Sequence, residues 1–310
     1  MTNIALIFPG QGAQEVGMGK EFYETSPEAR AVFDSADTVI PGLSGVIFNG
    51  PAEKLTSTAF CQPGIFTYSL AALAALKAHP KFQNLTPSFA AGLSLGELSA
   101  VAAAGALSFE QTLKLVERRS FFMDEACRQK KGAMAAVIGF SAPGGDKKLL
   151  EICREAGCEV ANFNSPDQIV ITGEAGKVAA ASKKIEEAGA KRVIALDVAG
   201  AFHSSLMAPA VPEFQAELAK VQFAEPAFPV VANVDGRPAG TGAKIRENLT
   251  TQITSPVQWV QTVETMAAAG VTTFLEIGPG TVLKGLIRKI NRDLTVINIR
   301  TPQDIENIDI

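Results

Sequence analysis

Residues 88–104 read SFAAGLSLGELSAVAAA and contain one strand, one tight turn and one helix in a single run. Residues 88–91 predict a short buried strand, and residues 94–104 predict a buried helix. Between them the chain matches G-x-S-x-G, a pattern typical of a strand-to-helix turn that pushes a serine hydroxyl out of a sheet. The start of a helix also favours negative charge. The alternative is an ordinary turn of small residues without chemistry, but such a turn does not require a strand before it and a helix after it. We therefore predict that Ser94 is a nucleophile.

Short apolar runs alternate with helical stretches on both sides of this segment. The predicted strands are 4–8, 230–233 and 273–277. The predicted helices are 19–40, 64–77, 108–127 and 257–269. Such alternation favours a parallel sheet with helices on both faces. We therefore expect an α/β fold for the larger part of the chain.

Residues 129–199 follow a different order of elements. Strands are expected at 133–140, 159–163, 168–172 and 192–196, and helices at 143–156 and 175–188. The order β-α-β-β-α-β is that of a ferredoxin-like module. We therefore predict a large α/β catalytic subdomain of residues 1–128 and 200–310, and a small ferredoxin-like subdomain of residues 129–199. A module inserted in this way creates a cleft, where ligands bind preferentially.

The composition is globular and argues against general nucleic-acid binding. The 310 residues carry a formal net charge of −4, and nucleic-acid binding depends on many contacts from Lys and Arg to phosphates. The four cysteines form no C-x-x-C pair and the chain has only two histidines, so we expect reduced core thiols and no metal site. The apolar stretch 70–76 is far shorter than the roughly 20 residues of a membrane-spanning helix. These features predict a cytoplasmic protein that does not enter a membrane.

A serine nucleophile needs a base with a pKa near neutrality, usually a histidine. His79 lies in a polar helix end before Pro80, and we interpret it as a solvated surface residue. His203 lies in a loop of small residues, 200–205, directly after the inserted module and therefore at the expected cleft. By elimination we predict that His203 is the base. The group that orients it stays open between Asp197 and a backbone carbonyl.

The glycine-rich segment FPGQG, residues 8–12, follows the first predicted strand. It is not a dinucleotide-binding G-x-G-x-x-G motif, because Glu15 stands where the third glycine would be, and the chain has no G-x-x-x-x-G-K-[ST] phosphate loop. Serine acyl transfer requires oxyanion donors, which are the amide after the nucleophile and one from a neighbouring loop. Leu95 and Gln11 are the candidates, although the loop by itself favours an ordinary tight turn.

Together these segments resemble the malonyl-CoA:acyl carrier protein transacylases of type II fatty acid synthesis and, more broadly, the acyltransferase domains of fatty acid and polyketide synthases. The similarity covers nearly the whole chain. The motifs are, in chain order, FPGQG at 8–12, GLSLG at 92–96, NFNSP at 162–166, the histidine at 203, PVQW at 256–259 and EIGPG at 276–280. The resemblance implies an α/β-hydrolase-like core with a parallel sheet, plus an inserted smaller ferredoxin-like subdomain.

The resemblance also implies a role for each matching residue. Ser94 corresponds to the acylated serine, and His203 corresponds to the catalytic histidine. Gln11 and Leu95 correspond to the residues whose backbone amides form the oxyanion hole. Gln252 corresponds to the residue whose backbone carbonyl holds the histidine, which would explain why no acidic third member of a triad stands out.

Arg119 corresponds to the arginine that binds the malonyl carboxylate. A guanidinium presents a planar fork that can hold a carboxylate by two parallel hydrogen bonds. A buried arginine near the nucleophile would favour an acid-bearing acyl group and would stay unpaired with an acetyl group, at a cost of several kcal/mol. Taken without the resemblance, the position of Arg119 beside Arg118 and Glu117 favours a solvated charge on a helix face.

Differences from the family pattern concern acyl selection. The family often has histidine directly before the serine, where this chain has Leu93, and many relatives carry an aromatic residue where this chain has Leu98. Phe202 resembles the middle residue of the Ala-Phe-His pattern of malonyl-selecting polyketide acyltransferases. Its ring would crowd an extra methyl group, a discrimination of about 1–3 kcal/mol. We expect Phe202 and Leu93 to line the acyl pocket and the activity to be retained.

The activity implied by the resemblance is transfer of a malonyl group from malonyl-CoA to the phosphopantetheine thiol of holo acyl carrier protein. The transfer passes through a malonyl-serine intermediate and supplies fatty acid biosynthesis. No cofactor is expected besides the CoA thioester substrate, and a monomer is expected. Because the carrier protein is acidic, a basic docking patch is expected, with a solvated face as the alternative interpretation. The candidates are Arg192, Lys284, Arg288 and Lys289.

Three alternatives belong to other classes. A serine acyl hydrolase, which passes the acyl group to water, fits G-x-S-x-G equally well, and Arg119 and the similarity along the whole chain weigh against it. A non-catalytic carrier-binding module is opposed by the presence of both Ser94 and His203. A free-standing acyltransferase of a polyketide pathway would use the same chemistry with a different carrier protein, and the sequence does not separate it from the first hypothesis.

Overall fold

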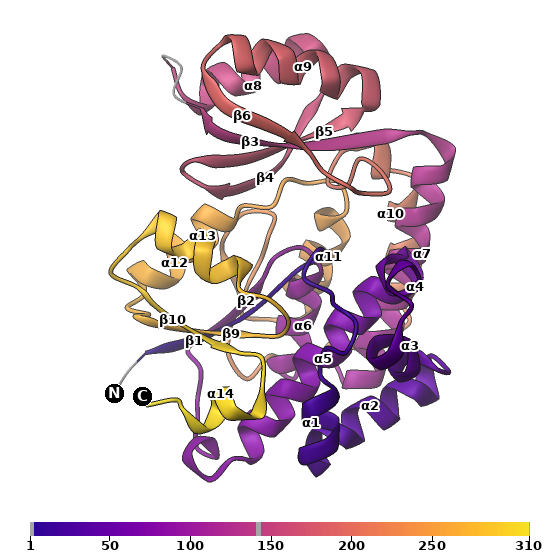
Figure 1. Cartoon of the computed structure of the whole chain (residues 1–310), viewed down its shortest axis with the longest axis vertical. Coiled ribbons are helices and arrows are strands. Elements are labelled where there is room, and N and C mark those ends of the chain that lie inside the picture. Colours follow the sequence, from indigo (N-terminus) through magenta and orange to yellow (C-terminus); the bar gives the residue numbers. More distant parts are fainter. Residues whose placement is uncertain (1–2, 141–143, 310) are drawn as a thin grey trace.

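The computed structural model describes residues 3–140 and 144–309, which form two β-sheets and the helices that cover them (Figure 1). The lower and larger part in that view combines the beginning of the chain, in indigo and purple, with its end, in orange and yellow. The upper part comes from the middle of the chain. The fold is therefore α/β, with one segment inserted into a larger unit.

The larger sheet has six strands in the order β10-β9-β1-β2-β7-β8. In chain order the strands are β1 (Ile4–Phe8), β2 (Phe89–Gly92), β7 (Val230–Val231), β8 (Pro238–Ala239), β9 (Thr273–Ile277) and β10 (Thr295–Ile299). Neighbours from β10 to β7 pair in parallel, and β8 pairs antiparallel with β7. Phe8 is aligned with Gly92, so the loops that follow β1 and β2 leave the sheet side by side. The carboxyl ends of parallel strands are where α/β proteins bind ligands.

Helices cover both faces of this sheet. Helices α12 (Trp259–Ala268) and α13 (Val282–Ile290) contribute their buried side chains to one face. The other helices of this part are α1 (Lys20–Thr25), α2 (Pro27–Val39), α3 (Leu43–Asn49), α4 (Ala52–Thr56), α5 (Thr58–Ala78), η1 (Pro80–Phe82), α6 (Leu95–Ala103), α7 (Phe109–Gln129), η2 (Ser205–Met207), α10 (Ala210–Leu218), α11 (Gly242–Gln252) and α14 (Pro302–Glu306).

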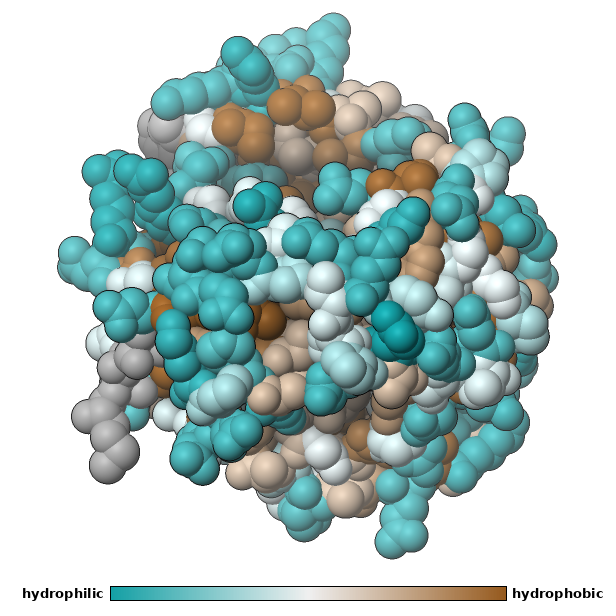
Figure 2. All heavy atoms as spheres, turned by 60° about the horizontal axis from the view of Figure 1, so that its bottom comes forward, coloured by the Kyte–Doolittle hydropathy of each residue, from teal (hydrophilic) through white to brown (hydrophobic). Residues whose placement is uncertain are grey.

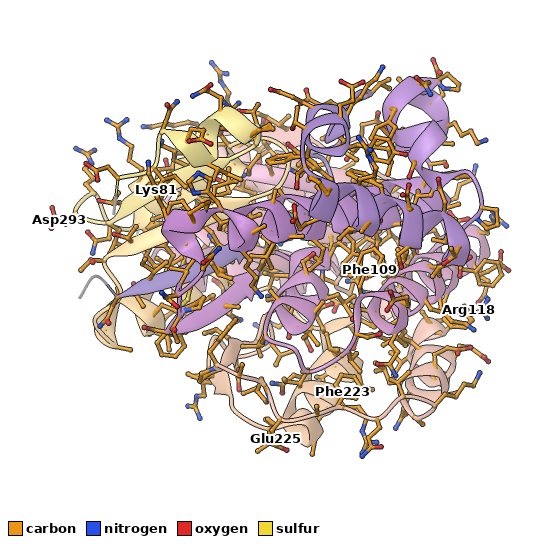
Figure 3. The ribbon with its side chains drawn as sticks, turned by 90° about the horizontal axis from the view of Figure 1, so that it is seen from below. Lys81, Phe109, Arg118, Phe223, Glu225 and Asp293 are labelled. Atoms are coloured by element: carbon orange, nitrogen blue, oxygen red, sulfur yellow. The ribbon has the colours of Figure 1, made fainter. Side chains whose placement is uncertain are left out.

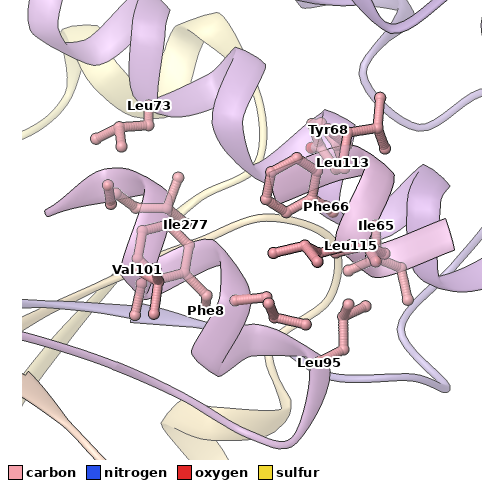
Figure 4. Close-up of a cluster of buried hydrophobic side chains, with 14 of the residues drawn as sticks. Phe8, Ile65, Phe66, Tyr68, Leu73, Leu95, Val101, Leu113, Leu115 and Ile277 are labelled. Atoms are coloured by element: carbon pink, nitrogen blue, oxygen red, sulfur yellow. The ribbon is translucent and has the colours of Figure 1, made fainter. Parts of the chain in front are cut away.

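The alternation of side chains along β1 divides the core into two clusters. Leu6 and Phe8 belong to the larger cluster, and Ala5 and Ile7 belong to the cluster under α12 and α13. Successive residues of a strand point to opposite faces, so a strand that is buried on both sides is apolar throughout. Figure 4 shows the larger cluster, in which Leu95 at the start of α6 lies among apolar side chains. The first residue after the predicted nucleophile is therefore fixed in the core.

Helix α5 is the central helix of the larger cluster. By length and composition it could cross a membrane, and 78% of its most apolar window is buried inside the protein. It packs against α2, α6 and α7. The apolar core helix predicted from 64–77 is thus found, extended at its beginning to Thr58 with Pro63 inside it. The surface in Figure 2 is by contrast mostly hydrophilic, with scattered hydrophobic residues.

The smaller sheet has four strands in the order β4-β5-β3-β6, all paired antiparallel. Its elements are β3 (Gly132–Phe140), α8 (Asp146–Ala156), β4 (Glu159–Ser165), β5 (Gln168–Glu174), α9 (Ala175–Glu187) and β6 (Ala190–Ala195). Both helices lie above the sheet in Figure 1, on the side away from the larger part. This succession and strand order are those of a ferredoxin-like module. The sheet and its helices span residues 132–195, inside the range predicted for the small subdomain.

The inserted module is joined to the larger part by two kinds of contact. The two segments that connect the module to the larger part lie against each other. A Cβ on Gly132 would lie 2.5 Å from the Cβ of Ala201, and a Cβ on Gly200 would lie 2.4 Å from the Sγ of Cys127. Farther on, Val257 bonds to β4, donating to the carbonyl of Ala161 at 2.8 Å and accepting from the amide of Phe163 at 2.9 Å. The small sheet therefore continues into the loop before α12.

Two further expected helices differ in the structure. The helix expected over 19–40 is two helices, because Ser26 has extended backbone (φ −116°) and its hydroxyl accepts from the amide of Ala29 to start α2. The helix expected over 143–156 begins at Asp146 and ends at Ala156, where Gly157 caps it in the left-handed conformation. Residues 141–143 lie outside the described residues.

Close approach of β2 and α6 generates a testable prediction about stability. A Cβ on Gly92 would lie 2.0 Å from the backbone carbon of Gly96, which cannot move aside like a side chain. We expect Gly92→Ala to lower the free energy of unfolding in urea by at least about 2 kcal/mol. The matched control is Gly45→Ala, because Gly45 is an exposed residue inside α3 with nothing within 4 Å of an added Cβ. This control should raise stability by up to about 1 kcal/mol, and equal effects of the two substitutions would contradict the packing argument.

Candidate active site

Ser94 lies at the N-terminus of α6 in a backbone conformation that residues other than glycine rarely adopt. Its φ is 53° and its ψ is −103°. Two side chains brace this turn: the amide of Ser94 donates to Oδ1 of Asn233 at 2.7 Å, and its carbonyl accepts from Nε2 of Gln252 at 3.0 Å. Backbone strain of this kind persists where the surroundings fix it, and it gathers at functional sites. The predicted strand–turn–helix geometry around Ser94 is present.

His203 lies directly against the hydroxyl of Ser94. Its Nε2 is 2.8 Å from Oγ of Ser94, and its Nδ1 is 3.0 Å from the carbonyl of Gln252 and 3.1 Å from the carbonyl of Ser255. Carbonyl oxygens only accept hydrogen bonds, so Nδ1 carries the proton and a neutral His203 uses Nε2 as an acceptor for the serine hydroxyl. This is the arrangement that a general base for Ser94 requires.

The pKa of His203 is lowered from 6.5 to about 4. Burial is the main cause, because a charged imidazole loses its hydration, and the positive charge of Arg119 lowers it further. Asp197, one of the two groups considered for orienting the histidine, is exposed and is not among the hydrogen-bond partners of His203. Two backbone carbonyls hold the ring instead, and they include that of Gln252.

Arg119 projects from α7 into the same site and is 1% exposed. One terminal nitrogen donates to Oε1 of Gln62 at 2.8 Å. The other donates to Oε1 of Gln252 at 2.8 Å and to Oγ of Ser94 at 3.1 Å. Its Nε has no hydrogen-bond partner among the described residues, although it is buried. The guanidinium is thus held at the nucleophile by two glutamine side chains, with donor capacity left over for a ligand.

A buried carboxylate, Glu97, lies on the first turn of α6 and belongs to the same cluster. Its Oε2 accepts from Nε2 of Gln252 at 2.7 Å and from the amide of Asn233 at 3.0 Å. Burial raises the pKa of Glu97 to about 7, against these hydrogen bonds and the charge of Arg119. Burial also lowers the pKa of Arg119 to about 10, which leaves the guanidinium charged at neutral pH. The site therefore holds a fixed positive charge that is buried away from the surface.

The loop after β1 runs alongside the turn that carries Ser94. A Cβ on Gly10 would lie 2.5 Å from the carbonyl of Leu93, and the side chain of Gln11 lies 3.4 Å from Nε2 of Gln62. The amide of Leu95 belongs to the first turn of α6, where backbone N–H groups lack partners in the helix. The two segments predicted to supply oxyanion donors are therefore neighbours at the nucleophile.

The two residues predicted for the acyl pocket lie in different surroundings. Phe202 is buried, and its carbonyl accepts from Oγ1 of Thr172 on β5, so that the inserted module fixes the residue before His203. Leu93 is half-buried and packs against the apolar cluster under α12 and α13. An acyl-pocket role for both residues stays a prediction.

His79 is not the solvated residue that its sequence suggested. It is half-buried, its Nδ1 accepts from the amide of Lys81, and its Nε2 lies 3.2 Å from Oε1 of Glu306. The interaction with α14, which is far away in sequence, could not be seen from the helix end alone.

Four residues of the cluster were missed by the analysis of the sequence. Two of them carry a signal, because a polar residue within a helix that is otherwise apolar is expected to have a buried partner. These two are Gln62 and Glu97. Asn233 follows a parallel strand at its carboxyl end, which is also an indication of a site. Ser255 contributes only its carbonyl and gives no signal in its side chain.

The chain is similar to known acyl transferases along nearly its whole length. The acyl transferase domain family matches residues 5–301 of the chain. The malonyl CoA-acyl carrier protein transacylase of Bacillus subtilis (strain 168) is 44% identical over 308 residues, which cover 99% of this chain and 96% of that protein.

Solved structures show the same similarity. The acyl-carrier-protein-S-malonyltransferase of Bartonella henselae has a TM-score of 0.92 and 39% identity, with 98% of each chain covered. A malonyl-transacylase in complex with its type II polyketide synthase acyl carrier protein has a TM-score of 0.91 and 35% identity, again with 98% of each chain covered. The chain therefore belongs to the acyl transferase domain family.

Proposed function

We propose that this chain transfers a malonyl group from malonyl-CoA to the phosphopantetheine thiol of an acyl carrier protein through a malonyl ester on Ser94. The observation that carries the proposal is the position of the buried Arg119 guanidinium, 3.1 Å from the hydroxyl of Ser94. A fixed positive charge at the nucleophile selects an acyl group that bears its own carboxylate. The names of the relatives, which are malonyl transacylases, support the same donor and acceptor.

In the acylation step the neutral His203 takes the proton of the Ser94 hydroxyl through Nε2. The oxygen attacks the thioester carbonyl, and the amides of Leu95 and Gln11 stabilise the negative charge on the carbonyl oxygen. When the carbon–sulfur bond breaks, the protonated His203 returns its proton to the CoA sulfur. The products are CoA thiol and malonyl-Ser94, and the histidine is neutral again.

In the second step the phosphopantetheine thiol of the carrier protein takes the place of CoA. His203 removes the thiol proton, the sulfur attacks the ester carbonyl, and the serine oxygen leaves with the proton of His203. The cycle uses only groups of this chain and its substrates, and we propose no further cofactor. The monomeric state and the cytoplasmic location stay predictions of the sequence.

For carrier docking, the four candidate basic residues lie in two places. Lys284, Arg288 and Lys289 lie on α13, which contacts β4 of the inserted sheet. Lys289 forms an ion pair with Asp167 at 3.3 Å, so part of its charge is compensated within the chain. Arg192 lies on β6, the edge opposite β4. We propose the α13 group as the main docking patch for an acidic carrier protein of fatty acid synthesis, with a polyketide carrier as the alternative partner.

Removal of the nucleophile gives the first prediction of the proposal. Intact mass spectrometry of the wild-type protein with malonyl-CoA should show a gain of one malonyl unit, which added holo carrier protein removes. Ser94→Ala should show no adduct. Ser99→Ala removes a buried hydroxyl of α6 that has no hydrogen-bond partner within residues 3–140 and 144–309, and this variant should still be acylated. Steady release of CoA without an adduct would favour the hydrolase, and acylation of Ser94→Ala would refute the assignment of the nucleophile.

Removal of the guanidinium tests acyl selection. Arg119→Ala should lower the ratio of kcat/KM for malonyl-CoA to kcat/KM for acetyl-CoA by at least about 30-fold, or about 2 kcal/mol, because the carboxylate would lose its buried partner. The matched control is Arg118→Ala, because Arg118 lies at the edge of the molecule in Figure 3 and pairs with Glu217. Equal losses of malonyl and acetyl transfer in Arg119→Ala would exclude the carboxylate-binding role.

The lowered pKa of His203 predicts an unusual pH profile. Neutral His203 is the active form, and its pKa of about 4 keeps it neutral as the pH falls, until the pH approaches 4. The kcat/KM for CoA release should therefore change less than about twofold between pH 7 and pH 5, whereas an ordinary histidine of pKa 6.5 would lose about 25-fold. His79→Gln, which removes the other histidine, should give the same profile. An acid limb centred near pH 6.5 in both proteins would contradict the neutral, buried base.

A further inference from the structure

Glu97 is an acidic member of the buried cluster that the proposed cycle does not use. It is 1% exposed and lies one turn after the nucleophile on α6. Its Oε2 accepts two hydrogen bonds, from the Gln252 side chain and from the Asn233 amide. Burying a carboxylate is costly unless it is hydrogen-bonded. The groups that bond to Glu97 are therefore the ones whose positions it can affect.

The side chain of Gln252 has two ends of equal shape and opposite character. Its Nε2 faces three oxygens, which are Oε2 of Glu97 at 2.7 Å, the carbonyl of Ser94 at 3.0 Å and Oδ1 of Asn233 at 3.4 Å. Its Oε1 faces the guanidinium of Arg119 at 2.8 Å. If the amide turned over, an oxygen would face these acceptors and an NH₂ group would face a cation. The surroundings therefore allow one orientation.

Of the three oxygens that accept from Nε2 of Gln252, Oε2 of Glu97 is the most important for the orientation of the Gln252 amide. The Ser94 carbonyl also accepts from the backbone amide of Glu97 at 3.1 Å, and Oδ1 of Asn233 already accepts from the amide of Ser94 at 2.7 Å. Oε2 of Glu97 is the nearest acceptor, and it accepts in either protonation state, because a proton would sit on Oε1. It is therefore the oxygen whose loss would free the amide to turn.

The orientation of Gln252 decides how Arg119 is held. Oε1 of Gln252 and Oε1 of Gln62 each accept from one terminal nitrogen of the guanidinium, from two different helices. The Gln252 amide also stands between Arg119 and Glu97, with one end on each. The acid therefore reaches the cation through an amide, and the guanidinium stays available for a carboxylate from outside.

We propose that Glu97 is a positioning residue for acyl selection: through Oε2 it fixes the orientation of the Gln252 amide, which holds the Arg119 guanidinium in place for the carboxylate of the acyl group. The inference rests on the proposed function, since it assumes that Arg119 binds that carboxylate. It assigns to Glu97 an effect on the choice between acid-bearing and neutral acyl groups that is distinct from its contribution to folding.

Three substitutions of Glu97 separate these contributions. Glu97→Gln can keep an oxygen at the position of Oε2, Glu97→Asp withdraws the oxygen by one methylene, and Glu97→Leu removes it. The readout is the ratio of kcat/KM for malonyl-CoA to kcat/KM for acetyl-CoA, with thermal unfolding measured on each variant. The control is Val101→Ala, because Val101 is fully buried in the larger cluster on the same helix, and its truncation lowers stability without removing a partner of the Gln252 amide.

The expected result is a ratio within about threefold of wild type for Glu97→Gln and Val101→Ala, and a fall of at least about tenfold for Glu97→Leu. Glu97→Asp should lie between them, and it decides the matter if the leucine variant does not fold. An unchanged ratio in both Glu97→Asp and Glu97→Leu would overturn the proposal, as would a ratio in Glu97→Gln as low as in Glu97→Leu.

Coupling to Arg119 distinguishes this inference from the proposed function. If Glu97 acts through Arg119, Glu97→Asp should change the ratio in the wild-type background and leave it unchanged in the Arg119→Ala background. The same fall in both backgrounds would overturn the positioning role. If Arg119→Ala alone leaves the ratio unchanged, the carboxylate-binding function of Arg119 fails. If Arg119→Ala lowers the ratio and the Glu97 variants do not, only the role of Glu97 fails.

Discussion

The burial of the Arg119 guanidinium is the constraint on which the rest of the site depends. A charged group that is 1% exposed loses nearly all of its hydration. Hydrogen bonds with neighbouring polar groups must offset that loss. Two glutamine side chains from α5 and α11 supply acceptors, and a carboxylate stands behind one of them. The same charge helps to keep His203 neutral, after burial itself. One cation therefore links acyl recognition, the state of the base and the cluster beneath the serine.

The strained turn of Ser94 depends on a second constraint, the close packing of backbone against backbone. Gly92 and Gly96 bring β2, α6 and the end of β1 to within distances that no side chain allows. Asn233, from the end of β7, then satisfies both the amide of Ser94 and the carbonyl of Gly92. His203 also has a positive φ, of 54°. The nucleophile and its base are thus both held in conformations that isolated peptides avoid, and the compensation comes from segments far away in sequence.

The sequence could predict those features that depend on neighbouring residues. Alternation of apolar runs gave the two kinds of sheet, and G-x-S-x-G in its strand-to-helix context led to Ser94. Only two histidines were available, so His203 followed by elimination, whereas Arg119 and Gln252 entered through resemblance to a family. The hydrogen bonds of Gln62 could not be predicted, because they join α5 to α7 and to the loop after β1. The break between α1 and α2 at Ser26 was missed because capping by one hydroxyl is a weak signal within a longer helical pattern.

The narrow joint of the inserted module has a consequence for how the protein can vary. The chain leaves the larger part beside Cys127 and returns at Gly200, where a Cβ would lie 2.4 Å from the Cys127 sulfur. The two ends of the inserted module are therefore in contact, and for the larger part the module is equivalent to a loop with adjacent ends. The entropy cost of closing a loop grows only slowly with its length, by about 0.6 kcal/mol for each doubling, so the host tolerates a long insertion here. Substitutions on the outer helices α8 and α9, which lie on the side of the small sheet away from the larger part, are therefore compatible with an unchanged joint. The glycines of the joint leave no room for a side chain, and a shift of Gly200 would reach the catalytic base, because His203 lies only three residues beyond it.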